Sequence, residues 1–158
     1  MLRALSDLAG VGVTTPPRAQ VMFLAQYSNP KSAGWVRAIT ELSAQSLIFY
    51  PSPGHVALTA EGWKVAPRSA PVTSSADLHH RIYELLDSVS ERMLRILIEH
   101  HPMPVAREQL MSASGYSNQK SAGFVNGLSK LRALGFVEAF APGEVRATDL
   151  LFIERAGA

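Results

Sequence analysis

Apolar side chains recur at helical spacing in two separated parts of the chain. Leu2, Leu5 and Leu8 are spaced three residues apart near the start, and Leu94 and Leu97 repeat this spacing much later. Such spacing places apolar groups on one side of a helix. The sequence therefore predicts that two similar helical segments open with an amphipathic helix.

Capping residues followed by proline mark the expected starts of the next helices. Thr15-Pro16-Pro17 and Ser28-Asn29-Pro30 each combine an N-cap residue with a proline, which is favoured in the first helical turn. The second of these signals predicts a helix over 30–45. The corresponding helix in the second half is predicted over 119–134.

Short strands are predicted after each of these helices. LIFY (47–50) and HVALT (55–59) flank the turn PSPG, and FVEAF (136–140) and EVRAT (144–148) flank the turn APG. Aromatic and β-branched residues on both sides of a proline–glycine turn are typical of a hairpin. Three helices followed by a hairpin is the order of a winged helix-turn-helix.

One octapeptide occurs twice. YSNPKSAG occupies 27–34 and YSNQKSAG occupies 116–123, with seven of eight residues identical. At this offset of 89, residues 18–62 align with 107–151 without a gap and with 17 identities over 45 positions. The match predicts an internal duplication. We expect a mainly α-helical fold with small β-hairpin wings (α+β), built from two tandem winged helix-turn-helix domains.

The segment between the copies is rich in proline and serine and reads APRSAPVTSS. We predict winged-helix domain 1 over 1–66, a linker and connecting helix over 67–89, and winged-helix domain 2 over 90–158. Apolar residues at roughly heptad spacing place the connecting helix over 77–87. This helix would pack the modules together or form a homodimer.

A second helix start is expected directly after the connecting helix. Ser88 and Glu91 have the spacing of a capping box, in which two side chains satisfy free backbone N–H groups. Ser74 or Ser75 would cap the connecting helix itself, with its start near Asp77.

Composition and charge narrow the function classes. Hydrophobic residues make up 47% and charged residues 18%, as in a folded protein with a core. The net charge of +2 permits an anionic partner. The chain has no cysteine, which excludes disulfides and thiolate sites and makes a reducing cytoplasm the expected location. No apolar run approaches the length of a membrane span, so no membrane partner is expected.

The repeated octapeptide supplies the candidate DNA-binding residues. Lys31 and Lys120 precede the third helix of each copy, where free backbone N–H groups and the helix dipole attract phosphate. Arg37 and Asn126 lie further along, on a face that a major groove could meet. The predicted set is Ser28, Asn29, Lys31, Ser32 and Arg37 in the first copy, with Ser117, Asn118, Lys120, Ser121, Asn126 and Lys130 in the second.

Helix capping and core packing offer another interpretation of the residues in the repeated octapeptide. Asn29 would cap a helix, Gly34 would allow close approach, and Tyr27 and Trp35 would fill a core, as would their counterparts in the second copy. The lysines would then lie on an ordinary solvated surface. Charge also weighs against strong DNA binding, because 1–63 holds four basic and three acidic residues and the predicted wing tips hold no Arg or Lys.

No enzymatic site is predicted. His79-His80 and His100-His101 are adjacent pairs, which point to different faces of a helix and rarely chelate one metal. The chain shows no nucleophile-elbow or catalytic-triad pattern. We therefore expect a non-enzymatic protein with no catalytic residue, no metal and no cofactor.

The run SGYSNQKSAGFVNGLSKLRALGFVE (114–138) resembles the paired winged-helix regions of bacterial ATP-binding and mobile-element proteins. Its marks are Tyr-Ser at 116–117, Ala-Gly-Phe at 122–124 and Leu-Arg-x-Leu-Gly at 131–135. The resemblance implies the same architecture in both copies and is weaker in the first, where Gln26 replaces the glycine. Larger relatives carry an ATPase, whereas this chain has no phosphate-binding G-x-x-x-x-G-K-[ST] motif.

The leading hypothesis is a DNA-binding protein that applies two similar recognition helices to double-stranded DNA. It would act as a transcriptional regulator or as an accessory factor of replication or of a mobile element. The alternative is a protein–protein interaction scaffold built from tandem winged helices. A positive face on both third helices favours DNA, and an exposed apolar patch favours a protein partner.

Overall fold

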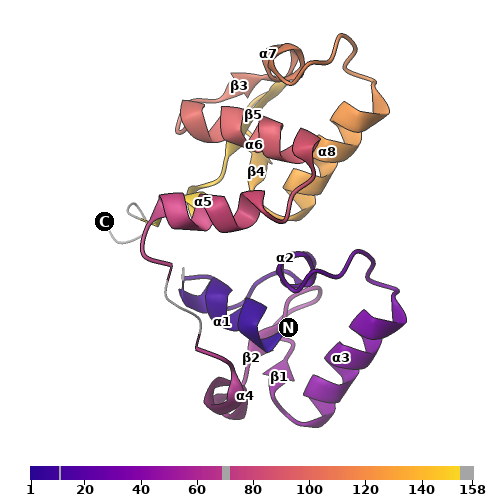
Figure 1. The fold of residues 1–158 in the computed structure, drawn as a ribbon, viewed down its shortest axis with the longest axis vertical. Helices are drawn as coiled ribbons and strands as arrows, with labels where there is room; N and C mark the ends of the chain where they lie inside the picture. Colours follow the sequence, from indigo (N-terminus) through magenta and orange to yellow (C-terminus); the bar gives the residue numbers. More distant parts are fainter. Residues whose placement is uncertain (11, 69–71, 154–158) are drawn as a thin grey trace. The chain divides into compact units, whose positions relative to one another are not determined.

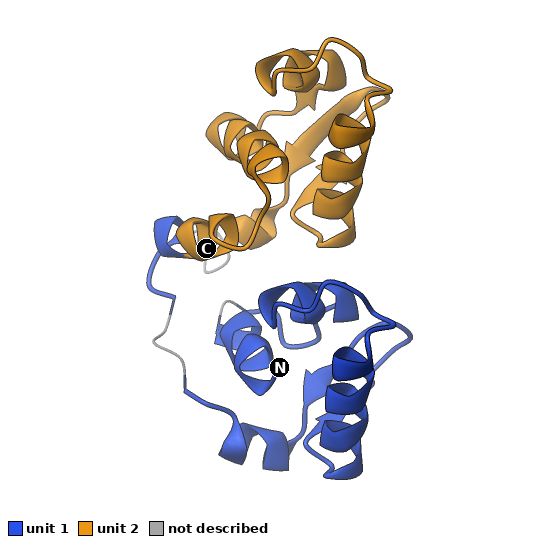
Figure 2. Ribbon diagram, turned by 45° about the vertical axis from the view of Figure 1, so that its right-hand side comes forward, with its two compact units in different colours: residues 1–77 blue, residues 78–158 orange. Residues whose placement is uncertain are grey.

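The computed structural model describes residues 1–10, 12–68 and 72–153 (Figure 1). The chain is mainly helical with small antiparallel sheets. It divides into two compact units, Met1–Asp77 and Leu78–Ala158 (Figure 2). Residues 69–71 of the predicted linker and 154–158 at the end of predicted domain 2 lie outside the described residues. Within the described part, no helix is both long and apolar enough to cross a bilayer.

Unit 1 consists of three helices, a short hairpin and a further helix. The two strands are antiparallel, with Ile48 opposite Leu58. A single bridge between Pro17 and His55 extends the pairing to the segment before the second helix. The elements are α1 (Leu2–Gly10), α2 (Arg18–Leu24), α3 (Ala33–Ala44), β1 (Ile48–Phe49), β2 (Ala57–Leu58) and α4 (Ala60–Val65).

Unit 2 also has three successive helices before its hairpin, here with a three-stranded antiparallel sheet in the order β3-β5-β4, and a further helix precedes them. Val145 lies at the centre of this sheet, paired with Val105 on one side and Ala139 on the other. The elements are α5 (Ser75–Tyr83), most of which belongs to unit 2, α6 (Ser88–His100), β3 (Val105–Ala106), α7 (Arg107–Ala113), α8 (Ala122–Ala133), β4 (Val137–Ala139), β5 (Glu144–Ala147) and the 3-10 helix η1 (Asp149–Leu151).

The elements of the two units recur at the offset of the sequence repeat. The bounds of α2 and α7 differ by 89, as do those of α3 and α8. A side-chain hydrogen bond after the third helix recurs as well. Thr59 Oγ1 donates to the carbonyl of Ser46 at 2.6 Å, and Thr148 Oγ1 donates to the carbonyl of Gly135 at 2.7 Å. Matched local geometry therefore accompanies the matched sequence.

Left-handed backbone positions also recur where the second and third helices end. Gly115 and Gly135 have φ of 87° and 75°, the left-handed conformation in which glycine commonly ends a helix. Gln26 and Ser46 occupy the same positions in unit 1 with φ of 61° and 57°. Because an L-residue is strained in this region, the backbone of unit 1 carries more strain at these two positions than the backbone of unit 2.

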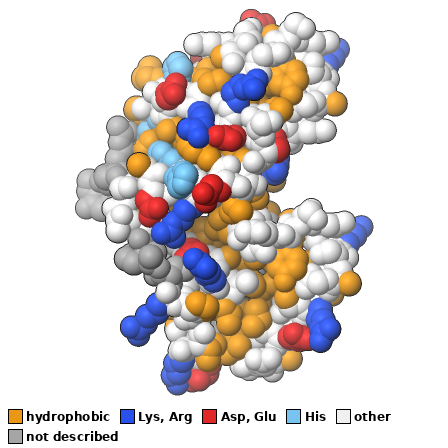
Figure 3. Space-filling view, viewed as in Figure 1, with side chains coloured by type: hydrophobic (Ala, Val, Ile, Leu, Met, Phe, Trp, Pro, Cys, Tyr) orange, Lys and Arg blue, Asp and Glu red, His pale blue; other side chains and the backbone are white. Residues whose placement is uncertain are grey.

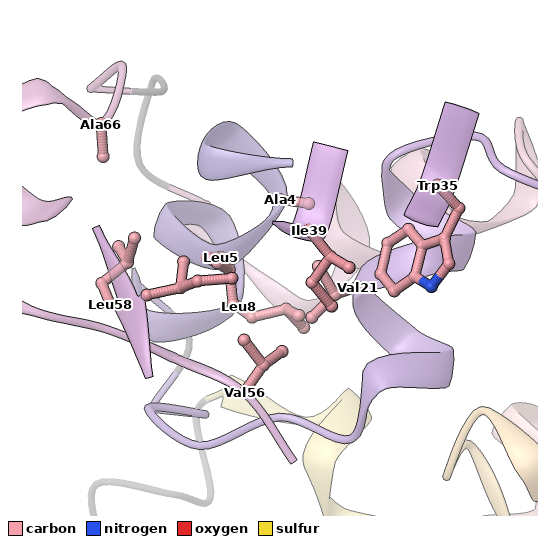
Figure 4. Packing of buried hydrophobic residues seen from close by; sticks show 10 residues of the cluster. Ala4, Leu5, Leu8, Val21, Trp35, Ile39, Val56, Leu58 and Ala66 are labelled. Carbon is pink, nitrogen blue, oxygen red and sulfur yellow. The ribbon is translucent and has the colours of Figure 1, made fainter. Parts of the chain in front are cut away.

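Each unit has its own hydrophobic core. In unit 1, side chains from three helices and the hairpin converge (Figure 4). In unit 2, α6 and α8 supply most of the fully buried side chains. The main members are Leu5, Leu8, Val21, Trp35, Ile39, Val56 and Leu58 in unit 1, and Met93, Leu94, Leu97, Leu110, Phe124, Leu128, Leu131 and Val145 in unit 2.

The predicted start of the third helix is wrong in both units. Helix α3 begins at Ala33 and α8 at Ala122, three residues later than expected. The N-cap of α3 is Ser32, whose Oγ accepts a hydrogen bond from the N–H of Trp35 at 3.3 Å. Asn29 instead accepts from the N–H of Lys31 at 2.8 Å. The side chain of Asn29 thus closes a turn before the helix, because a short amide competes for nearby backbone groups.

Two other predicted caps are also wrong. Helix α2 begins at Arg18 with no capping side chain, so Thr15 does not cap it. The N-cap of α6 is Asp87, whose carboxylate accepts from the N–H of Ser90 at 2.9 Å. The helix thus starts at Ser88, one residue earlier than a cap at Ser88 would place it, with Asp87 in the capping role that the sequence assigned to Ser88.

The connecting helix is shorter than the predicted 77–87 and ends at Tyr83. Ser74 caps it by accepting from the N–H of Asp77 at 3.1 Å, one of the two predicted caps. Ile82 is 2% exposed, and the guanidinium of Arg95 lies 3.9 Å from the centre of the Tyr83 ring. Part of the apolar side of α5 is therefore already covered by other residues of the same chain. The homodimer through this helix stays a prediction.

Replacing Ser46 by glycine is expected to stabilise unit 1 by about 1 kcal/mol. The change removes the strain of an L-residue in the left-handed region, and this gain exceeds the loss caused by the higher conformational entropy of glycine in the unfolded state. Both tryptophans, Trp35 and Trp63, lie in unit 1, so tryptophan fluorescence during urea unfolding follows this unit. Ser43→Gly, inside α3, is the matched control and should lower stability by about 0.5 kcal/mol. Equal losses for the two variants would contradict the assignment of strain to Ser46.

Candidate nucleic-acid interface

Helices α3 and α8 each bury one side and expose the other. Trp35 and Phe124, at matched positions, are 4% and 0% exposed and point into their cores. Residues spaced by four, three and four positions form an exposed line on the opposite side, which we name the outer stripe. It consists of Ala33, Arg37, Thr40 and Ala44 in α3, and of Ala122, Asn126, Ser129 and Ala133 in α8.

The turn before each of these helices has the same internal geometry in both units. Asn29 Oδ1 accepts from the N–H of Lys31 at 2.8 Å, and Asn118 Oδ1 accepts from the N–H of Lys120 at 2.8 Å. The two predicted asparagines therefore shape the turn. Each fixes the backbone of the lysine that follows two residues later, directly ahead of the helix.

Aromatic packing holds this turn against its helix. The rings of Tyr27 and Trp35 meet edge to face with centroids 5.5 Å apart, and those of Tyr116 and Phe124 lie 6.0 Å apart. A side chain at Gly123 would collide with the hydroxyl of Tyr116. These contacts are the ones that the packing interpretation expects for the tyrosines, the aromatic residues and the glycine of unit 2.

The predicted cations fall into two groups. Lys31 and Lys120 are exposed, and within residues 1–10, 12–68 and 72–153 no ion pair holds either ammonium group. Arg37 donates from Nε to Glu41 Oε1 at 2.7 Å. Lys130 pairs with a carboxylate of another helix. The two lysines of the turn are thus the cations of the predicted set that face solvent without a carboxylate partner.

Lys130 has a structural role. Its ammonium lies 2.9 Å from Asp87 Oδ2, so the pair joins α8 to the start of α6 across 43 residues of sequence. Partial burial opposes ionisation of Asp87. Hydrogen bonds from the Ser90 N–H, the Lys130 ammonium and the Ser90 hydroxyl outweigh this effect and lower the pKa of Asp87 to about 2.

The serines of the predicted set lie at two kinds of position, in the turns and at the helix starts. Ser28 and Ser117 are exposed in the turns. Ser32 caps α3, whereas Ser121, at the same position before α8, makes no side-chain capping bond. The hydroxyl of Ser32 therefore serves as a cap, and that of Ser121 does not.

Sequence reasoning missed part of this surface. Thr40 and Ser129 belong to the outer stripe, and Glu41 holds the side chain of Arg37, yet none of them was in the predicted set. The helical period gives a signal for the two hydroxyls, because they lie three residues beyond Arg37 and Asn126 on the same side.

Two arginines next to the hairpins contact side chains of their own unit. The guanidinium of Arg18 lies 4.4 Å from the centre of the Tyr50 ring, and that of Arg146 lies 4.8 Å from the centre of the Phe140 ring. Arg146 also bonds to Glu138 at 2.6 Å. These arginines stabilise the hairpins and do not extend from their tips.

The histidines take part in packing within unit 2. His79 donates from Nε2 to the carbonyl of Leu151 at 2.8 Å, and His101 stacks on Phe152 with ring centroids 3.8 Å apart. His101 Nε2 lies 2.9 Å from Asp149 Oδ1. Among the described residues, no group of three or more His, Cys, Asp or Glu side chains is arranged to hold a metal ion.

Comparisons with protein-family models, with curated proteins and with solved structures find no match to this chain. The distinguishing feature of the candidate interface is the recurrence, in both units, of the same turn, the same exposed lysine and an outer stripe of the same pattern.

Lys130→Met is expected to raise the pKa of Asp87 towards its ordinary value, because one of the bonds that favour the carboxylate is lost. Since the folded-state pKa is lowered, Asp87 contributes stability above about pH 4 that is lost as the pH falls towards 2. The variant should lose less stability over this acidic range. A carbon-13 NMR titration of the Asp87 carboxyl measures the shift. Lys120→Met is the control and should leave this pKa unchanged, and an unchanged value in Lys130→Met would contradict the ion pair.

Proposed function

We propose that the protein is a non-enzymatic DNA-binding protein made of two tandem winged helix-turn-helix modules that arose by internal duplication. Helices α3 and α8 are its recognition helices, and it acts as a transcriptional regulator or as an accessory factor of replication or of a mobile element. Support comes from the order of three helices and a hairpin in each unit and from element bounds that recur at the offset of 89.

The observation that carries this proposal is the recurrence of exposed residues. Burial explains why apolar residues match between the units, but it places no demand on the opposite side of the helix. Ala33 and Ala44 nevertheless recur as Ala122 and Ala133, and the hydroxyl of Thr40 recurs in Ser129. Duplication alone makes the two copies alike at first, and a shared ligand is a reason for the exposed side to stay alike.

Duplex DNA fits the shape of this side. A helix with its side chains is about 10–12 Å across, and the major groove is about 12 Å wide. Small residues in the outer stripe let the helix backbone come close to the base edges. The polar residues in the middle of the stripe are then at the correct depth for contacts with bases.

The turn lysines supply the contact with the DNA backbone. Lys31 and Lys120 lie next to helix starts, where unpaired N–H groups and the helix dipole already favour a phosphate. Two such modules in one chain engage two half-sites, as a dimer of single modules does. With a net charge of only +2, non-specific affinity is modest and depends on salt.

A protein-interaction scaffold is the second candidate, favoured by apolar exposure in unit 1. Phe49, Trp63 and Val65 are 46%, 49% and 55% exposed. Hydrophobic side chains gather on the face of unit 1 that Figure 3 presents. At the position of Phe49, unit 2 has Glu138, so this exposed aromatic side chain is not shared by the two units. A surface of this kind suits a protein partner.

Fluorescence anisotropy of a mixed-sequence DNA duplex, titrated with the protein across a salt series, tests the leading proposal. Binding should weaken steeply as salt rises. The double variant Lys31→Glu/Lys120→Glu should bind much more weakly. Because two phosphate contacts are lost, its plot of log affinity against log salt concentration should be less steep by about 2.

A variant with the same change in net charge controls for non-specific repulsion. Arg3→Glu/Lys64→Glu changes two exposed cations of α1 and α4 and should retain most of the affinity. Equal loss in both double variants would show that overall charge, not the turns, governs binding. Absence of binding by the wild-type protein even at low salt would reject the DNA proposal and favour the scaffold.

A further inference from the structure

We infer that the two recognition helices read different bases, with a guanine opposite Arg37 and an adenine opposite Asn126. The inference rests on the proposed DNA-binding function and goes beyond it by assigning a base to each module. It makes the preferred target a composite of two unlike half-sites, although the modules that read them are built on one plan.

Arg37 and Asn126 occupy the same position in matched helices. Each is the fifth residue of a helix of 12 residues, α3 or α8, and each is exposed at the middle of the outer stripe. The other stripe positions are alanine in both helices or carry a hydroxyl in both. Arginine against asparagine is therefore the main chemical difference between the two outer stripes.

The geometry of Arg37 leaves its guanine-binding groups available. Its Nε donates to Glu41 Oε1 at 2.7 Å, one helical turn further on, while its side chain remains 80% exposed. This bond engages the inner side of the guanidinium, so the terminal amino groups remain for the O6 and N7 acceptors of guanine. Glu41 acts as a positioning residue that holds the guanidinium plane.

Asn126 offers a different pattern. Its amide carries one acceptor and two donors, which match the N6 amino group and N7 of adenine. The position equivalent to Glu41 is Lys130 in unit 2, and Lys130 pairs with Asp87 of α6. Unit 2 therefore has no carboxylate at the position that holds Arg37 in unit 1, and its stripe has the shorter, uncharged side chain at its middle.

Selection from a duplex library with a randomised central segment tests the inference, using the whole chain. The wild-type site should contain one half-site that requires guanine and another that requires adenine. Exchanging the base pair at either position should weaken binding about 5-fold to about 150-fold in anisotropy competition with the selected duplex.

Two symmetrising variants make the assignment specific. Arg37→Asn should convert the guanine requirement to adenine, and Asn126→Arg should convert the adenine requirement to guanine. Glu41→Gln should keep the guanine but reduce discrimination against other bases, because the guanidinium is held less firmly. All three positions are exposed. Circular dichroism of each variant verifies that the helices are intact, and a change of selected base is a readout that a merely structural role would not produce.

Three results would overturn the inference. Identical selected sites for the wild-type protein and both symmetrising variants would show that these residues do not read bases. Binding of the library without enrichment of any sequence would also reject it, while leaving the proposed DNA-binding function in place. Failure of the wild-type protein to retain any duplex at low salt would reject the proposed function and this inference together.

Discussion

Packing of the third helix against its own unit is the interaction on which the rest of each unit depends. Trp35 and Ile39 bury one side of α3, and Phe124 and Leu128 bury the same side of α8. Each large apolar side chain contributes about 1.5–3 kcal/mol when buried, whereas an exposed ion pair such as Arg37 with Glu41 is screened by water. The core therefore sets the rotation of both helices, and this rotation directs the outer stripe to solvent.

The charged side chains act through contacts with neighbouring side chains and do not give the protein one strong electrostatic field. The net charge is +2, and several cations are held by neighbours: Lys130 by Asp87, Arg146 by Glu138, and Arg18 over Tyr50. These pairs fix α6, α8 and the hairpins. Lys31 and Lys120 have no ion-pair partner within the described residues, and they lie beside the starts of α3 and α8, where a phosphate is favoured. On the proposed function, these two positions would orient even a weakly basic chain on DNA.

The sequence predicted three helices and a hairpin in each copy, because helical spacing and proline–glycine turns are local signals. It misplaced the start of α3, since capping rules do not reveal that the amide of Asn29 takes the N–H of Lys31 before the helix begins. The sequence also did not reveal which residues far apart in the chain interact. Lys130 lies 43 residues from Asp87, and only the packing of α6 beside α8 brings them together. Strand β3 was not predicted either, because it is only two residues long and is defined by its pairing with β5.

Mapping of duplex contacts by NMR is the most direct test that α3 and α8 form the DNA-binding surface. Backbone amide signals of labelled protein would be followed while a DNA duplex is added at low salt. The account predicts that the largest shifts occur at 31–44 and 120–133, with Lys31 and Lys120 among the most affected. Shifts confined to β1 and α4, around Phe49 and Trp63, would contradict it, as would an absence of shifts in either third helix.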